Sequence, residues 1–257
     1  MRWIYLSPHL DDAELSGGGL IYEQSHSGIP VEICTFMCGY APQDAVSPLA
    51  QLLHTQWGFS SSEESTRMRR EEDQKAAAIV GAKTVHFDFL DCIYRRGARG
   101  EWLYSDISMP PHEEDLEIPS QIAEAISARL ARDDMLVCQL SVGSHVDHVL
   151  VRWGAELLGR RLLYNIDVPY IFYKPEELQP KSAGMQETVY PITEAGPRSW
   201  NEAVLAYKSQ IPLLGDAFNT PEKVQESIQS YWAEWKGIRL FEFPEVGDKC
   251  LVLARNS

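Results

Sequence analysis

The chain has 257 residues, of which 44% are hydrophobic and 23% charged, a composition that can bury a full core and excludes an intrinsically disordered protein. Its formal net charge of −14 argues against nucleic acid or an anionic membrane surface as the main partner, because both require a positive face. We therefore expect one folded domain over residues 1–257.

The five cysteines are odd in number, scattered and mostly set within apolar runs: Cys34, Cys38, Cys92, Cys138 and Cys250. We expect reduced, buried thiols, because a disulfide framework uses an even number of cysteines. The N-terminus lacks the basic and apolar regions of a signal peptide, and no apolar run is long enough to cross a bilayer. These features predict a soluble, cytoplasmic protein and leave its assembly into a homo-oligomer open.

Apolar strand patterns alternate with helix patterns through the first two thirds of the chain. Strands are predicted at residues 3–6, 31–37, 84–90 and 135–138, and helices at residues 13–27, 61–81, 120–132 and 147–161. Such alternation with right-handed crossovers gives a parallel sheet flanked by helices, a Rossmann-like α/β fold. In the doubly wound order 3-2-1-4-5 the first and fourth strands are neighbours, and ligands bind at the edge where those strands end.

Two long segments and a C-terminal region elaborate this core. Residues 38–59 and 91–118 are predicted to be long loops, and loops of that length in compact domains are usually functional. After residue 168 we expect a strand at 170–173, helices at 200–210 and 220–235, and a closing extended stretch at 240–243.

Three consecutive glycines, Gly17, Gly18 and Gly19, lie in the early turns of the first predicted helix. Each costs about 1 kcal/mol of helix stability relative to alanine, which favours close packing of this helix over direct contact with a substrate. A dinucleotide-binding fingerprint is the weaker alternative, because the glycines follow the strand-to-helix turn and the adjacent acids would repel a pyrophosphate.

Two short polar motifs follow predicted strands and carry the candidate chemistry. Residues 7–12 read Ser-Pro-His-Leu-Asp-Asp, and residues 143–148 read Gly-Ser-His-Val-Asp-His. His9, Asp12 and His148 would form a two-histidine, one-carboxylate set, the pattern of catalytic metal sites that keep positions open for water or substrate. Asp11, His145 and Asp147 then remain for proton transfer.

Simpler interpretations compete with these roles. Either Asp11 or Asp12 could only cap the first helix, as aspartate often does at such a junction. An isolated histidine is more often a packed or solvated side chain than a ligand, and we interpret four histidines in that way: His26, His54, His86 and His112.

The two motifs resemble the paired His-Pro-Asp-Asp and His-Pro-Asp-His motifs of the PIG-L/LmbE-like deacetylases. The resemblance extends to Arg-Arg-Glu-Glu at residues 69–72 with the alanines that follow, to Asp91 after the third strand, and to the Ser-Gln that ends residues 206–210. The chain departs from the family pattern at Leu10 and Val146, which replace prolines, and at Ala13, where an acid is common. None of these departures removes a candidate ligand.

The resemblance implies an LmbE-like fold and a zinc-dependent amidohydrolase that acts on a linear amide C–N bond. In that family's pattern, His9, Asp12 and His148 would bind Zn²⁺, with Fe²⁺ or another divalent metal as alternatives. Asp11 would be the general base, and protonated His145, its ring held by Asp147, would stabilise the oxyanion. The substrate implied is a small N-acetylated sugar conjugate of the N-acetylglucosamine type.

Five residues are candidate substrate contacts: Arg70, Asp91, Arg95, Arg96 and Arg99. The last three arginines form a basic cluster that could capture an anionic conjugate, and they could equally offset nearby acids such as Asp91 and Glu101. The same motifs could also serve a metal hydrolase of a non-sugar amide or ester, or a degenerate sugar-binding protein without activity. A nucleotide-binding protein is the weakest alternative, because neither usual phosphate-binding loop is present.

Overall fold

The computed structural model describes residues 1–42 and 46–244. Seven strands form one sheet in the order β3-β2-β1-β4-β5-β7-β6. They are β1 (Trp3–Ser7), β2 (Val31–Thr35), β3 (Lys83–His86), β4 (Met135–Gln139), β5 (Leu162–Asn165), β6 (Gln186–Pro191) and β7 (Gly237–Glu242). Strands β1 to β5 pair in parallel, and β7 pairs antiparallel with both β5 and β6. The α/β fold and the expected order 3-2-1-4-5 are confirmed, although the fifth strand lies earlier in the sequence than we expected.

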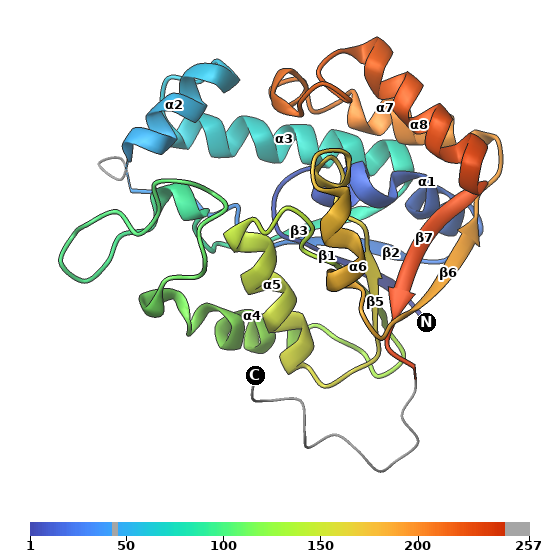
Figure 1. Cartoon of the computed structure of the whole chain (residues 1–257), viewed down its shortest axis with the longest axis horizontal. Helices are drawn as coiled ribbons and strands as arrows, with labels where there is room; N and C mark the ends of the chain where they lie inside the picture. Colours follow the sequence, from blue (N-terminus) through green and yellow to red (C-terminus); the bar gives the residue numbers. More distant parts are fainter. Residues whose placement is uncertain (43–45, 245–257) are drawn as a thin grey trace.

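Helices cover both faces of the sheet (Figure 1). One face carries α1 (Asp12–His26), α3 (Ser62–Val80), α7 (Ala195–Val204) and α8 (Pro221–Trp235), and the other carries α4 (Ile118–Ser127) and α5 (Val146–Leu157). Two shorter helices are α2 (Pro48–Trp57) and α6 (Leu178–Lys181). Single 3₁₀ turns are η1 (Cys92–Tyr94), η2 (Glu113–Asp115), η3 (Tyr170–Phe172), η4 (Pro175–Glu177) and η5 (Ile211–Leu213).

Strand β1 lies at the centre of the sheet and supplies side chains to the core on each face. Ile4 and Leu6 belong to the core beneath α4 and α5, whereas Trp3 and Tyr5 belong to the core beneath α1 and α7. A strand buried on both faces reads as a continuous apolar run, which is why the sequence predicts it well.

The pairing of β1 with β4 brings the two polar motifs together. Leu6 is in register with Cys138, so the segments that leave both strands emerge at the same edge of the sheet. This is the switch point of the doubly wound topology, where the chain leaves β1 toward α1 and leaves β4 toward α5.

Helix boundaries follow the expected capping chemistry. The Ser61 hydroxyl accepts a hydrogen bond from the Glu64 amide at the start of α3, and Gly81 ends that helix with φ of 76°. Thr220 caps α8 in the same way by accepting from the Lys223 amide.

Outside the core helices and strands, two predictions were wrong, one strand was missed, and the helix expected at residues 200–210 runs instead from Ala195 to Val204. Residues 38–59 contain α2, which starts with Pro48 after the capping residue Ser47, so this segment is not a continuous loop. Residues 170–173 form the 3₁₀ turn η3 rather than a strand, and the fifth strand is the short apolar run Leu162–Asn165. Strand β6 was not predicted, because it is mostly exposed and lacks an apolar face.

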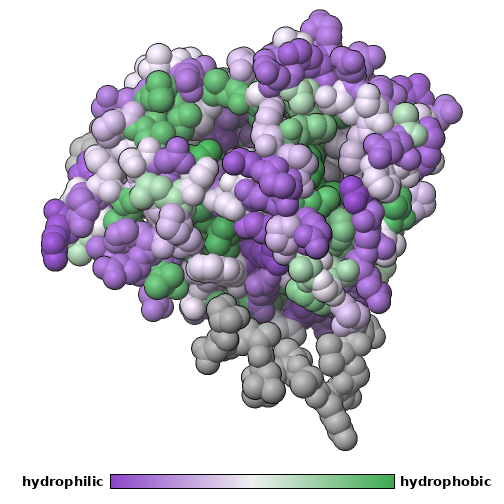
Figure 2. All heavy atoms as spheres, viewed as in Figure 1, coloured by the Kyte–Doolittle hydropathy of each residue, from purple (hydrophilic) through white to green (hydrophobic). Residues whose placement is uncertain are grey.

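The cysteines are buried, as the sequence predicts, and the surface of the described residues is mixed in polarity. Cys34, Cys38, Cys92 and Cys138 are buried and free, and Cys250 lies outside the described residues. Hydrophilic and hydrophobic residues are interspersed over the face drawn in Figure 2. Within residues 1–42 and 46–244, none of the helices combines the length and the apolar character that a membrane span requires.

The glycines of α1 permit close helix packing, as expected. A Cβ atom on Gly18 would lie 2.6 Å from Cδ1 of Trp200, and one on Gly19 would lie 2.8 Å from Cδ1 of Ile192. The indole nitrogen of Trp200 also donates a hydrogen bond to the Leu15 carbonyl at 3.2 Å. This contact ties α7 to α1 next to the first motif.

Gly18→Ala is therefore expected to destabilise the protein, although alanine is the better helix former. Overpacking against Trp200 should cost about 1–3 kcal/mol, which exceeds the gain of about 1 kcal/mol in helix propensity. Urea denaturation would measure the free energy of unfolding. Gln229→Ala, on an exposed position of α8, serves as the control and should change it by less than about 0.5 kcal/mol. An unchanged or raised stability for Gly18→Ala would contradict this packing argument.

Candidate active site

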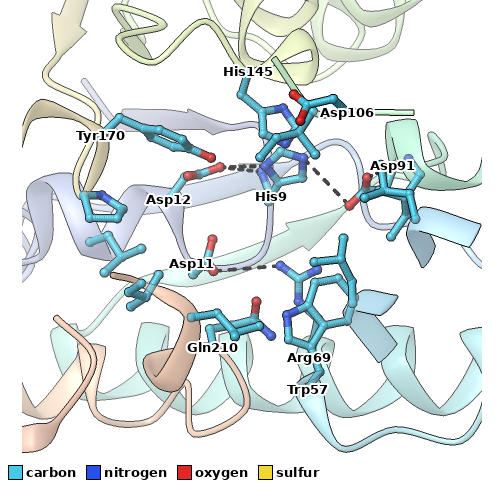
Figure 3. Close-up of a pocket in the computed structure, with 18 residues that line it drawn as sticks. His9, Asp11, Asp12, Trp57, Arg69, Asp91, Asp106, His145, Tyr170 and Gln210 are labelled. Atoms are coloured by element: carbon cyan, nitrogen blue, oxygen red, sulfur yellow. Dashed lines mark hydrogen bonds and ion pairs between the residues drawn. The ribbon is translucent and has the colours of Figure 1, made fainter. Parts of the chain in front are cut away.

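The first motif forms a tight turn between β1 and α1. The Ser7 hydroxyl donates to the His9 carbonyl at 2.7 Å, and the His9 amide donates to Asp12 Oδ2 at 2.8 Å. Asp11, the residue before α1, has φ of 146° and its side chain makes no capping hydrogen bond. A non-glycine residue held at this φ is strained, and its carboxylate is directed into a pocket (Figure 3). Helix capping therefore does not explain Asp11.

Two of the predicted histidines converge on one carboxylate oxygen of the predicted ligand Asp12. Asp12 Oδ2 lies 3.2 Å from Nδ1 of His9 and 3.3 Å from Nε2 of His148. The other nitrogen of His148, Nδ1, is 2.8 Å from Oδ1 of Asp167, and Asp167 in turn accepts a hydrogen bond from the Val142 amide. An outer carboxylate of this kind fixes which imidazole nitrogen faces the centre.

These side chains fit a divalent metal ion. Nε2 of His148 is buried and makes no hydrogen bond of good geometry, although Asp12 Oδ2 lies 3.3 Å from it, an arrangement that normally costs free energy. A ligand atom of His9, of His145 and of His148 can all lie within 4.8 Å of one another. Two imidazole nitrogens beside one carboxylate oxygen form a donor set that zinc and iron(II) both accept.

Asp147 supports His9, not His145 as we expected. Its Oδ2 lies 3.0 Å from Nε2 of His9 and accepts a hydrogen bond from the Cys92 amide at 3.0 Å. Its other oxygen, Oδ1, accepts from the guanidinium of Arg95. The Asp147 carboxylate thus orients the imidazole whose opposite nitrogen faces Asp12.

His145 is positioned by backbone instead. It precedes α5, and its Nδ1 accepts a hydrogen bond from the Asp147 amide at 3.1 Å, which leaves Nε2 as the protonated nitrogen of the neutral ring. Burial and the neighbouring His9 and His148 lower the pKa of His145 well below its usual value. The expectation of a protonated His145 is therefore not supported, and the neutral ring can still donate through Nε2.

The adjacent aspartates experience opposite electrostatic environments. Burial and the charge of Asp12 raise the pKa of Asp11 to about 7, a value suited to accepting a proton near neutral pH. Burial opposes ionisation of Asp12, but His148 and His9 outweigh it and hold its pKa well below the usual range. Asp12 therefore stays anionic while Asp11 can exchange a proton.

A cavity of about 320 Å³ opens above these residues. Its polar part is lined by His9, Asp11, Asp12, Arg69, Asp91, Asp106, His145 and Gln210. Figure 3 shows Arg69 pointing toward Asp11, and their closest atoms are 3.8 Å apart. Asp91 Oδ2 lies 3.9 Å from Nε2 of His9, so of the five predicted substrate contacts Asp91 lines this cavity.

Arg70 points away from the cavity, and its neighbour Arg69 takes the position that we expected for it. Nε of Arg70 donates to the Cys38 carbonyl at 2.9 Å, and Nη2 donates to Asp88 at 2.7 Å. Consecutive residues on a helix face directions about 100° apart, so only one of the two can face the site. The sequence offered no means of choosing between them.

The arginine cluster of residues 95–99 does not line the cavity in the described structure. Arg95 is buried between Asp147 and Asp115, with its Nε 3.1 Å from Asp115 Oδ2. Arg96 stacks 4.1 Å from the ring of Trp102, and Arg99 is exposed. Arg95 therefore offsets the charge of nearby acids and does not contact the substrate cavity. Those acids are Asp147 and Asp115, not the ones that we named from the sequence.

Trp57 belongs to the segment 38–59 that we predicted to be functional, but the sequence analysis did not single out two other cavity residues, Tyr170 and Gln210. Gln210 belongs to the Ser-Gln pair, in which Ser209 is anchored to Glu72 of α3 by two hydrogen bonds, so that signal was available. Tyr170 packs its ring 5.3 Å from that of His148. Both Tyr170 and Trp57 come from segments whose secondary structure we predicted wrongly.

Arg95→Gln should destabilise the fold strongly, because it leaves the buried carboxylates of Asp147 and Asp115 without their cation. Breaking a buried ion pair by removing one partner costs about 3–5 kcal/mol. Urea denaturation of the variant would test this expectation against Arg99→Gln, an exposed neighbour whose replacement should cost less than about 0.5 kcal/mol. Equal stabilities of the two variants would show that Arg95 does not compensate the buried acids.

Comparison with known proteins identifies several that are similar to this chain in sequence and in fold. Over 240 residues the chain is 27% identical to a 2'-N-acetylparomamine deacetylase of Niallia circulans, covering 85% of this chain and 84% of that protein. Teicoplanin deacetylase in a zinc-inhibited form superposes with a TM-score of 0.81 and 26% identity, covering 94% of this chain and 97% of that one. The A40926 pseudoaglycone deacetylase superposes with a TM-score of 0.74 and 27% identity, covering 95% and 96%.

A family model covers the part of the chain that holds both motifs. The PIG-L model, described as GlcNAc-PI de-N-acetylase, matches residues 4–156. This range is more than half of the 257 residues and runs from β1 to the end of α5. The chain therefore belongs to the PIG-L family.

Proposed function

We propose that this protein is a metal-dependent hydrolase that removes the acetyl group from an N-acetylated sugar conjugate. The observation that carries the proposal is the convergence of His9 Nδ1 and His148 Nε2 on one oxygen of Asp12, beside the carboxylate of Asp11, which makes no capping hydrogen bond and faces Arg69. The names of the relatives support it, since they deacetylate paromamine and glycopeptide derivatives. We further propose that residues 1–257 act as a single domain.

His9, Asp12 and His148 would hold the metal ion, and zinc is our first choice for it. When bound, a divalent cation supplies Lewis acidity, which polarises an amide carbonyl and acidifies water. Asp147 and Asp167 would orient the two imidazoles through their outer nitrogens, at 3.0 and 2.8 Å. Both support residues are fully buried, which keeps the ligands in place.

Asp11 and His145 would carry out the proton chemistry. Asp11 takes a proton from water as the water oxygen bonds to the acetamido carbonyl carbon. The Nε2–H of neutral His145 donates to the carbonyl oxygen as negative charge develops there. The C–N bond then breaks, Asp11 returns the proton to the leaving nitrogen, and acetate and a free amine result.

Release of acetate from N-acetylated sugars tests this proposal directly. Purified protein loaded with one equivalent of zinc, or of iron(II), would be incubated with N-acetylglucosamine glycosides, and acetate and free amine would be measured together. We expect equal amounts of both products, and no activity from His148→Ala, which should also fail to retain metal by elemental analysis. Cleavage of acetyl esters or non-sugar acetamides alone would favour a different metal hydrolase. Full metal content in His148→Ala would remove His148 from the ligand set.

The two adjacent aspartates should separate in a paired experiment. Asp11→Asn is expected to keep its metal and lose a factor of about 10²–10⁴ in kcat, the usual contribution of a general base. Asp12→Asn is expected to lose the metal, because it removes the anionic ligand whose oxygen lies between the two histidines. Metal content and kcat would be measured for both variants. Metal loss in Asp11→Asn with retention in Asp12→Asn would reverse the two roles.

A further inference from the structure

The cavity above the polar residues has a hydrophobic wall that the proposed chemistry does not use. It consists of Leu49, Leu53, Trp57, Ile107, Leu213 and Leu214, which we call the apolar wall. These residues come from α2, from the segment between η1 and η2, and from the turn around η5. Figure 2 shows the hydrophobic residues that gather over α2.

Exposure increases from the polar floor of the cavity toward this wall. His9, Asp11 and His145 on the floor are each no more than 7% exposed, whereas Leu213 is 38% exposed, and Leu49 and Leu53 are partly exposed. An amide placed on the floor therefore directs the rest of its molecule along the apolar wall. Concave sites that combine a few polar groups with apolar walls are typical of ligand pockets.

The charges around the cavity disfavour an anionic conjugate. Four carboxylates line it, Asp11, Asp12, Asp91 and Asp106, whereas Arg69 is the single arginine among its described lining residues. The guanidinium of Arg69 is already stacked 4.7 Å from the ring of Trp57 and faces Asp11. Even when the proposed divalent cation is counted with Arg69, the four carboxylates leave the cavity without an excess of positive charge that would attract a phosphate or carboxylate on the substrate.

We propose that the apolar wall binds a hydrophobic aglycone, an alkyl or aryl group attached to the N-acetylated sugar. This inference rests on the proposed function, which places the acetamide on the polar floor. The aglycone is the occupant because the acetyl group ends in a single methyl, which cannot span a wall built from three segments. The wall and the catalytic residues line one continuous cavity, so one molecule can contact both.

The test compares glycosides of N-acetylglucosamine that differ only in the aglycone. Metal-loaded protein would be assayed with the methyl glycoside, the octyl glycoside and the 1-phosphate. Burial of several methylene groups should make KM at least tenfold lower for the octyl than for the methyl glycoside, and the 1-phosphate should be the poorest substrate. Calorimetric titration with the same compounds measures binding without turnover.

Substitutions in α2 provide a matched pair. Leu53→Ser should raise KM for the octyl glycoside much more than for the methyl glycoside, because it removes apolar surface from the wall. Leu52→Ser changes an adjacent leucine that is 56% exposed and lies outside the cavity lining, so it should leave both values unchanged. Leu214→Ser alters the wall from a different segment and provides the same test if Leu53→Ser fails to fold.

The possible outcomes separate this inference from the proposed function. If no glycoside releases acetate, the proposed function fails, while tighter calorimetric binding of the octyl glycoside would still support the wall. Equal binding of octyl and methyl glycosides, or preference for the 1-phosphate, overturns the inference. Preference for an N-octanoyl over an N-acetyl methyl glycoside assigns the wall to the acyl chain and also overturns it. Sedimentation could also detect a dimer that Leu53→Ser dissociates. That result would overturn the inference, because the wall would then contact a second copy of the chain.

Discussion

A single carboxylate oxygen, Oδ2 of Asp12, brings the two halves of the site together. It contacts the His9 amide and imidazole from its own turn and the His148 imidazole from the first turn of α5. The contact is possible because β1 and β4 are hydrogen-bonded neighbours at the switch point of the sheet. Close packing at the glycines of α1 then holds this helix, which follows the turn, against α7.

Buried charge is the main energetic constraint on this arrangement. Asp12, Asp147 and Asp167 are almost fully removed from solvent, and an isolated buried carboxylate would cost several kcal/mol. Each is compensated by an imidazole, a guanidinium or a backbone amide. The compensation extends outward through Arg95 to Asp115, so the segment between η1 and η2 is tied to the centre by electrostatics as well as by packing.

The chemistry and the substrate surface come from different parts of the chain. The catalytic motifs lie on turns of the parallel core, whose geometry is set by strand pairing. The apolar wall is built from α2, the segment around Ile107 and the turn at η5, which are additions to that core. Function on a common fold usually varies in this way, because connecting segments can change while the scaffold holds the reacting groups.

The sequence by itself determined the first four strands, the two motifs and the family resemblance, because buried parallel strands and polar strand-to-helix turns have strong local patterns. His9, Asp11, Asp12, His145 and Asp147 could be named from those turns, and their meeting followed from the expected topology. Tertiary structure alone decided which residues surround them. It turned Arg69 toward Asp11 and Arg70 away, buried Arg95 on Asp147, and brought Gln210 and the leucines of α2 to one cavity. Side-chain direction and long-range contact depend on how distant segments pack, and no local pattern records that.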